Sequence, residues 1–259
     1  MDGSFLTILL MAAVAGLASP VGGVLAIWLR PSSLLLSISV GFAAGILLGT
    51  FAFEMIPKAL ELGSLALVCL GFATGFAAIY GLDFYVNRGQ MAGPEASERE
   101  EVERALKRKR PLGSNAAVLA GATSSEEIIE GITIGVGAAV DPSVALVVAL
   151  AICIDNISEA MSIGELMWSE RQEHARRRIL KWTSLIGISL FVSALAGWLL
   201  LRGLPKPALG FLFATGAGGM LYLTVTDLIP EAEARQYEQS SAVATGAGFL
   251  LALILSELS

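Results

Sequence analysis

Eight long apolar runs follow one another along this chain of 259 residues, and each is about long enough for a helix to cross a lipid bilayer. Because 55% of the residues are hydrophobic and only 15% are charged, the chain has more apolar surface than the core of a soluble protein needs. The sequence therefore predicts an all-α integral membrane protein with eight transmembrane helices, built as a single domain over residues 1–259. We predict spans at about 5–29, 33–57, 63–87, 114–140, 143–166, 182–202, 207–230 and 240–258.

Basic residues indicate how these helices are oriented. If the N-terminus lies outside, 14 of the 17 Lys and Arg residues fall on the inner side, many of them in a polar loop at about 88–113. Because cytoplasmic loops are enriched in Lys and Arg, we predict a multi-pass protein of the cell (inner or plasma) membrane, with both termini outside and this loop in the cytoplasm. The net charge of −6 argues against a nucleic-acid partner and leaves the lipid bilayer as the surroundings.

An internal repeat relates the second and seventh spans. The segment GFAAGILLGTFAFEMIPKA (41–59) aligns with ATGAGGMLYLTVTDLIPEA (214–232), and both contain an acid followed by x-Ile-Pro. In the predicted topology these two helices cross the membrane in opposite directions. This is the pattern of an inverted repeat, which is common among secondary transporters.

A second repeat places acidic side chains in the middle of the fourth and fifth spans, where EEIIEGITIG (126–135) aligns with DNISEAMSIG (155–164). Five carboxylates would cost roughly 12–17 kcal/mol if each stood alone in hydrocarbon. No Lys, Arg or His lies near them in either helix, so the options are shared protons, a water-filled cavity or bound cations. The polar residues of the two segments are Glu126, Glu127, Glu130, Asp155, Asn156 and Glu159.

Helical spacing favours the cations. Glu126 and Glu130 are four residues apart and share one helical face, and Asp155 and Glu159 repeat that spacing. Two antiparallel helices would then present their oxygens to one small volume, where a divalent cation supplies the positive charge that like-charged carboxylates need. The site residues predicted for metal are therefore the six named above, and the metal is a transported substrate and not a catalytic cofactor.

Three alternatives to a metal transporter remain at this point. The acids could be protonated hydrogen-bonding groups between helices, or proton relays in a proton-linked carrier of a non-metal solute. An intramembrane metallohydrolase is disfavoured, because such sites are rich in His and the single His of this chain lies in a loop. We therefore expect a protein that is not an enzyme. Glu54, Asp83 and Asp227 lie nearer to helix ends, where they either line the solute pathway or reach the interface.

The chain resembles the Zrt/Irt-like (ZIP) metal transporters of the compact bacterial type. The family's fourth-helix pattern His-Asn-x-Pro-Glu-Gly matches Glu126–Gly131, and its fifth-helix pattern His-x-x-Pro-Glu matches Asp155–Glu159. The resemblance implies a 3+2+3 arrangement, with helices 1–3 and 6–8 as an inverted repeat and a metal site between helices 4 and 5. It also implies alternating access, with helices 1, 4, 5 and 6 moving against a scaffold of helices 2, 3, 7 and 8. A homodimer is left open.

The departures from the family pattern bear on the choice of metal. Acids replace both ligand histidines, at Glu126 and Asp155, and Ile129 and Ser158 replace the two prolines. Leu190 stands where many members carry an acid in the sixth helix. Imidazole suits Zn²⁺, whereas carboxylate and amide oxygens suit harder ions, although an all-oxygen site still binds later transition metals. We therefore predict transport of a divalent cation, Zn²⁺ or a related ion such as Mn²⁺, Fe²⁺ or Cd²⁺.

Overall fold

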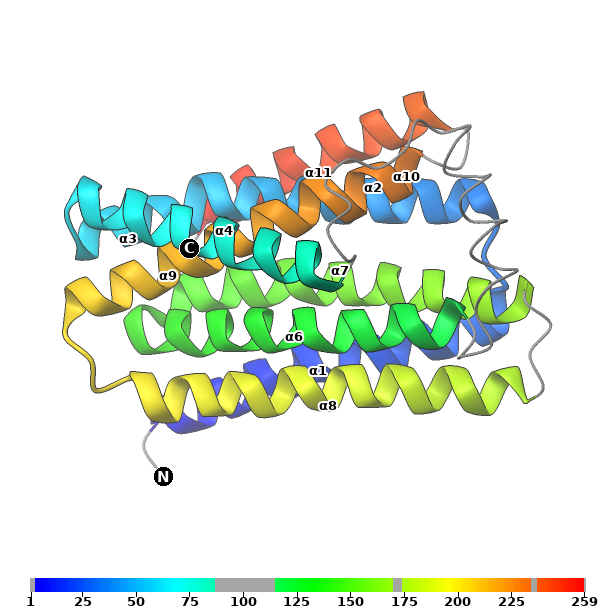
Figure 1. Ribbon diagram of the computed structural model, residues 1–259, viewed down its shortest axis with the longest axis horizontal. Helices are drawn as coiled ribbons and strands as arrows, with labels where there is room; N and C mark the ends of the chain where they lie inside the picture. Colours follow the sequence, from blue (N-terminus) through cyan, green and yellow to red (C-terminus); the bar gives the residue numbers. More distant parts are fainter. Residues whose placement is uncertain (1–2, 87–114, 170–173, 234–236, 259) are drawn as a thin grey trace.

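The computed structural model describes residues 3–86, 115–169, 174–233 and 237–258, and the predicted cytoplasmic loop at about 88–113 lies outside them (Figure 1). The described residues form helices and contain no strand. Seven spans are long and apolar enough to cross a membrane by length and composition. The remaining long helix holds the three acids Glu126, Glu127 and Glu130. The predicted all-α membrane protein is confirmed.

The predicted spans correspond to helices as follows. Spans 1 and 3 are α1 (Gly3–Leu29) and α4 (Leu65–Val86). Spans 4, 5 and 6 are α6 (Asn115–Val140), α7 (Pro142–Ser169) and α8 (Ala175–Leu201), and span 8 is α11 (Glu238–Leu258). Spans 2 and 7 are composite, running through α2 (Ser33–Thr50), η1 (Phe51–Met55) and α3 (Ile56–Leu62), and through α9 (Lys206–Leu223), η2 (Thr224–Leu228) and α10 (Ile229–Glu233).

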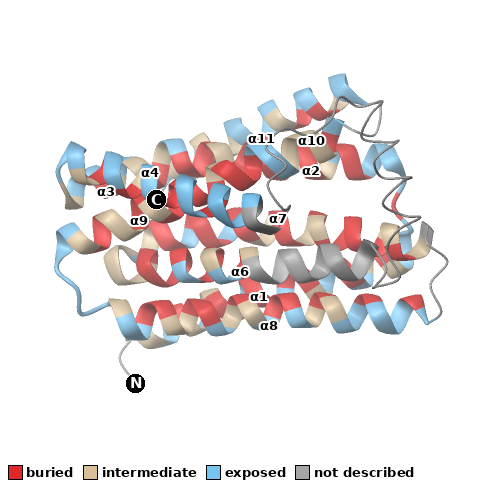
Figure 2. Ribbon diagram, viewed as in Figure 1, coloured by how far each residue is buried: buried red, intermediate tan, exposed pale blue. Residues whose placement is uncertain are grey.

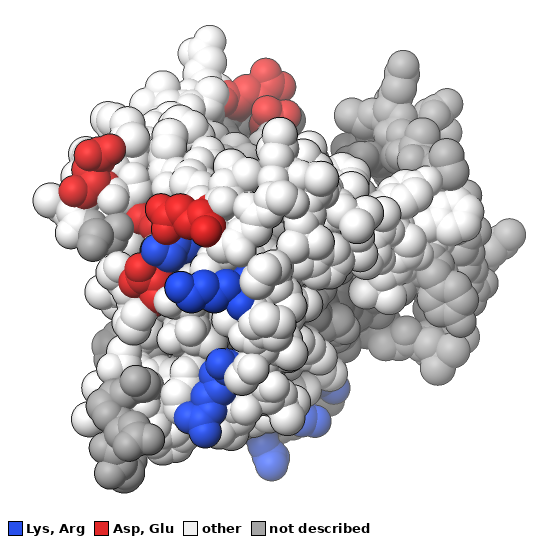
Figure 3. Space-filling view, turned by 90° about the vertical axis from the view of Figure 1, so that its left-hand side faces the viewer, with Lys and Arg blue, Asp and Glu red and all other residues white. Residues whose placement is uncertain are grey.

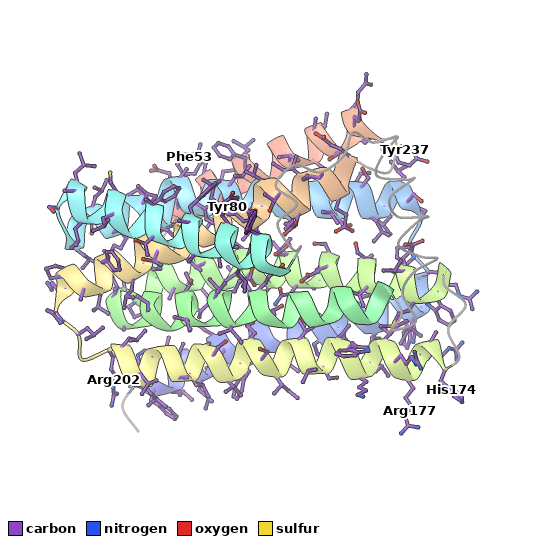
Figure 4. The ribbon with its side chains drawn as sticks, in the orientation of Figure 1. Phe53, Tyr80, His174, Arg177, Arg202 and Tyr237 are labelled. Atoms are coloured by element: carbon purple, nitrogen blue, oxygen red, sulfur yellow. The ribbon has the colours of Figure 1, made fainter. Side chains whose placement is uncertain are left out.

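Two of the predicted spans are shorter than the helices in the structure. Span 2 extends to Leu62, beyond the expected end at 57. The α8 helix begins at Ala175, seven residues before the expected start, because a helix continues past the hydrocarbon as a charged, solvated turn. Figure 4 shows His174 and Arg177 at one end of α8 and Arg202 at the other. Within these ends, Lys181 lies over Trp182 at 5.7 Å and Arg202 over Trp198 at 4.3 Å, as expected at membrane interfaces.

The helices form two layers (Figure 1). One layer contains α1, α6, α7 and α8, and the other contains α2, α3, α4 and α9 to α11. Within the first layer α1 packs on α7 and α6 packs on α8; within the second, α2 packs on α11 and α4 packs on α9. The layers meet mainly where α2 contacts α7 and where α9 contacts α6. This arrangement agrees with the 3+2+3 pattern predicted from the resemblance.

The inverted repeat appears in the backbone and in the packing. The π-helical segments η1 and η2 occupy equivalent positions, each just before an Ile-Pro pair. A Cβ at Gly45 would collide with the backbone oxygen of Thr245, and a Cβ at Gly218 would collide with that of Phe72. The same offset in residue number relates Gly45 to Gly218 and Phe72 to Thr245. The two halves therefore use the same close helix contacts, which small residues permit in lipid.

Apolar side chains also cover the outside of the bundle. On α1 an exposed stripe runs down one face at helical spacing through Leu6, Leu10, Val14, Leu17 and Val21. Buried residues fill the space between the helices, and exposed ones cover the outer faces (Figure 2). An apolar stripe of this length is stable only against another apolar surface, which here is the lipid.

The two ends of the bundle are packed differently. The α6–α7 turn, the α8–α9 connection, the start of α1 and the end of α11 lie at one end, which we call the turn end; it is on the left in Figure 1. The largest core cluster lies in the half of the bundle nearest this end and includes Met55, Val148, Leu190 and Phe213. Among the described residues, the opposite half is filled by smaller clusters. The turn end is therefore closed by a continuous apolar core.

Candidate metal centre

The six predicted site residues all lie in the interior of the bundle, on the central helices α6 and α7. A tight turn at Asp141 joins these helices, so they run antiparallel and pack against each other. Glu126 and Glu159 are partly buried. The other four are buried, with exposed fractions of 1% for Glu127 and Asn156 and 6% for Glu130 and Asp155. None of the six faces the lipid as an exposed side chain.

A side-chain hydrogen bond joins the two helices at the site. Asn156 Nδ2 donates a hydrogen bond to Glu127 Oε2 at 3.2 Å. The second oxygens, Glu127 Oε1 and Asn156 Oδ1, are buried and have no hydrogen-bond partner. Buried polar atoms are nearly always paired, so two unpaired oxygens on touching side chains point to a bound species or a solvent molecule at this place.

The remaining acids surround this pair within electrostatic range. Glu127 interacts with the carboxyls of Glu126, Asp155 and Glu159, and Glu130 interacts with the same three groups and with Glu127. Residues 111–170 contain no Lys, Arg or His, so neither helix supplies a cation. Within the ranges that the structure describes, no three His, Cys, Asp or Glu side chains lie close enough together to hold a metal ion.

The sequence comparisons agree with this architecture. A sequence model of the family described as ZIP zinc transporter matches residues 88–255. The chain belongs to the ZIP family. The zinc transporter ZupT of Salmonella paratyphi A is 29% identical to it over 234 residues, which cover 87% of this chain and 86% of the relative. The proteins of the same name from Salmonella newport (strain SL254) and Salmonella agona (strain SL483) give the same identity and coverage. The resemblance stated from the sequence is confirmed.

The three predicted pathway residues of this ZIP protein lie in different surroundings. Glu54 belongs to η1 and is buried, with 5% of its surface exposed. Asp227 is the equivalent residue in η2 and is exposed. The side chain of Asp83 lies outside the described part of the chain. The inverted repeat therefore places its two acids in unequal environments.

Sequence reasoning missed one acid near the site. Glu231, in α10, interacts electrostatically with Asp155 in α7. It approaches from the other layer, on the side of the site away from the turn end. The repeat alignment could have drawn attention to it, because Glu231 is the equivalent of Lys58, and each follows the proline that both repeats contain.

Lys58 joins the two layers at the turn end. Its Nζ lies 2.9 Å from Asp141 Oδ2 and 2.9 Å from Glu61 Oε2. Figure 3 shows basic and acidic side chains side by side on this face. Asp141 Oδ1 also accepts hydrogen bonds from the backbone N and the hydroxyl of Ser143. The hydrogen bonds from Lys58 and Ser143 lower the pKa of Asp141 from 3.8 to about 2.

Proposed function

We propose that this ZIP protein transports divalent metal cations through a carboxylate-lined site between α6 and α7. The proposal is carried by the buried contact between Glu127 and Asn156, which leaves one oxygen of each side chain unpaired. Glu130, Asp155 and Glu159 supply negative charge around this pair. The ZupT relatives are zinc transporters, which supports zinc as one substrate of this protein.

The donor atoms bear on the choice of cation. The six residues offer carboxylate and amide oxygens and no imidazole, a set that accepts Mn²⁺ and Fe²⁺ as well as Zn²⁺ and Cd²⁺. Geometry and availability then decide which ion is carried, since affinity in general rises toward the later transition metals. We therefore propose a broad divalent-cation transporter with zinc among its substrates.

Alternating access fits the packing of the two layers. The apolar cluster and the ion pair of Lys58 with Asp141 close the turn end, whereas polar groups such as Glu231 approach the site from the opposite side. With the turn end outside the cell, as the basic residues predict, we infer that this conformation is closed toward the outside. Movement of α1, α6, α7 and α8 against the other layer would open the turn end and close the opposite one.

Metal analysis of purified protein tests the proposal. Wild type is expected to bind divalent metal, and Glu130→Ala and Glu159→Ala are expected to bind at least about tenfold less, because each removes a charged ligand. Glu257→Ala removes an exposed acid near the C-terminus and serves as the matched control. Equal metal content in all four proteins would contradict the site.

Uptake into liposomes tests the substrate and the rival function. Competition among Zn²⁺, Mn²⁺, Fe²⁺, Cd²⁺ and Mg²⁺ gives the order of preference. If the acids were proton relays for a non-metal solute, none of these ions would be taken up and no metal would be bound.

A further inference from the structure

Two buried hydroxyls in the described helices have no hydrogen-bond partner, those of Ser19 in α1 and Ser162 in α7. Several other buried hydroxyls in the bundle bond to the carbonyl four residues earlier in their own helix. Thr50, Thr133 and Thr183 do so at 2.8, 2.8 and 2.9 Å. Since this local bond is available to any Ser in a helix, a hydroxyl turned away from it needs another explanation.

The neighbours of Ser19 define where its side chain points. Ser19 has no exposed surface. One turn away on either side, Gly16 packs on Gly187 of α8 and Gly22 packs on Ile157 of α7. Residues three apart share a helical face, so Ser19 faces the interior between α7 and α8 and does not face lipid.

The level of Ser19 along the membrane follows from the register of α1 and α7. Gly22 lies against Ile157 and Ala160, and Gly164 lies against Ala26, so the two helices run in the same direction. One turn back from Gly22 is Ser19, and one turn back along α7 from Ile157 and Ala160 are Cys153 and Asn156. Ser19 is therefore level with Asn156, whose Oδ1 is also unpaired.

Three unpaired oxygens thus come from three helices at one level: Ser19 Oγ from α1, Glu127 Oε1 from α6 and Asn156 Oδ1 from α7. The fourth helix of the layer, α8, contacts α6 beside this site, because Ser193 Oγ donates a hydrogen bond to the backbone carbonyl of Glu127 at 3.1 Å. A common level for three unsatisfied oxygens on neighbouring helices is the first condition for one oxygen-coordinated cation.

The repeat argues that this hydroxyl is more than a packing residue. The pairing of Gly16 with Gly187 makes Leu190 the equivalent of Ser19 in α8. Leu190 is completely buried and belongs to the apolar core of the turn end. Packing at this position is therefore satisfied by an apolar side chain in one half of the molecule, whereas the other half carries an unpaired hydroxyl.

We propose that Ser19 is a ligand of the transported cation. Its hydroxyl oxygen would come from a third helix, α1, and join Glu127 Oε1 and Asn156 Oδ1. The proposal rests on the proposed metal transport and adds α1 to the binding site. A neutral hydroxyl is a hard oxygen donor, so it favours Mn²⁺ relative to Cd²⁺. Ser19 thereby acts as a specificity-determining residue.

Metal binding by the full-length protein, measured by competition with a chelating dye, tests this role. Ser19→Ala is expected to weaken Mn²⁺ binding about tenfold, the effect of losing one supporting ligand, and to weaken Cd²⁺ binding less. Ser19→Cys replaces the hard donor by a soft one and is expected to raise the Cd²⁺/Mn²⁺ affinity ratio by at least about tenfold. Thr183→Val is the matched control, because its buried hydroxyl faces α1 but is bonded within its own helix.

The outcomes separate this inference from the proposed function. If Ser19→Ala matches Thr183→Val for every metal while Glu130→Ala loses binding, the metal site stands and the role of Ser19 is overturned. If wild type binds no metal, both are overturned. Should Ser19→Ala fail to fold, Ser19→Cys decides, since a purely structural role would leave its Cd²⁺/Mn²⁺ ratio at the wild-type value.

Discussion

The ion pair between Lys58 and Asp141 makes a quantitative prediction about the closed turn end. Lys58→Met removes the charge and keeps most of the side-chain length. The fall in the pKa of Asp141 from 3.8 to about 2 corresponds to about 2 kcal/mol at 1.36 kcal/mol per unit. The Ser143 hydrogen bonds supply part of this and remain in the variant, and the Asp141 side chain is 31% exposed to solvent. We therefore expect Lys58→Met to destabilise the closed turn end by about 1 kcal/mol.

A loss of this size shifts the population of the open turn end about fivefold. Cys153, in α7 beside the apolar core, is a native reporter for such opening. With Cys69 replaced by Ser, an impermeant thiol reagent applied from the turn end should label Lys58→Met about five times faster than wild type. Lys206→Met removes an exposed charge at the same end and should label at the wild-type rate. Equal rates for the two variants would refute a closing role for the ion pair.

The stabilisation by the ion pair between Lys58 and Asp141 depends on pH. The pKa of Asp141 is lower in the folded protein than its ordinary value of 3.8, so the carboxylate must be charged for the contact to stabilise the fold. The contribution is complete above about pH 4 and is lost as the pH falls toward about 2. The difference in Tm between wild type and Lys58→Met should follow this curve. A difference that stays constant down to pH 2 would contradict the assignment.

Two further predictions concern packing and selectivity. Gly45→Ala should lower the free energy of unfolding by about 1–3 kcal/mol, because its Cβ would collide with the backbone of Thr245, whereas Gly246→Ala, with nothing within 4 Å, should have little effect on Tm. The double variant Glu126→His, Asp155→His should raise the preference for Zn²⁺ over Mn²⁺ in liposome uptake, since imidazole suits Zn²⁺. An unchanged ratio would show that these two positions do not set selectivity.

Much of the fold could be predicted because its signals are local. Span lengths follow from apolar runs, and the repeat was visible as an acid–x–Ile–Pro match in segments 41–59 and 214–232. The π-helical segments before Pro57 and Pro230 could not be predicted, since they depend on how the chain accommodates a proline against its neighbours. The early start of α8 was missed because hydropathy reports the membrane boundary and not the helix end.

The candidate site was predicted as a set of residue types and not as a set of contacts. Six polar residues in two apolar helices were enough to place the site on α6 and α7. The sequence could not tell that Glu231 approaches Asp155, because the two belong to different layers. Nor could it single out Ser19, because most serines in helices satisfy their hydroxyl locally and only the structure shows that this one does not.

The sequence by itself determined the number and approximate extent of the membrane helices, the depth of the acids along them and the inverted repeat, since each is a pattern along one dimension. Only the tertiary structure decided that Asn156 bonds Glu127 and that Lys58 finds Asp141 across the layer boundary. The physical reason is that such pairings depend on the rotation and relative shift of packed helices, which many side chains fix together and no single segment encodes.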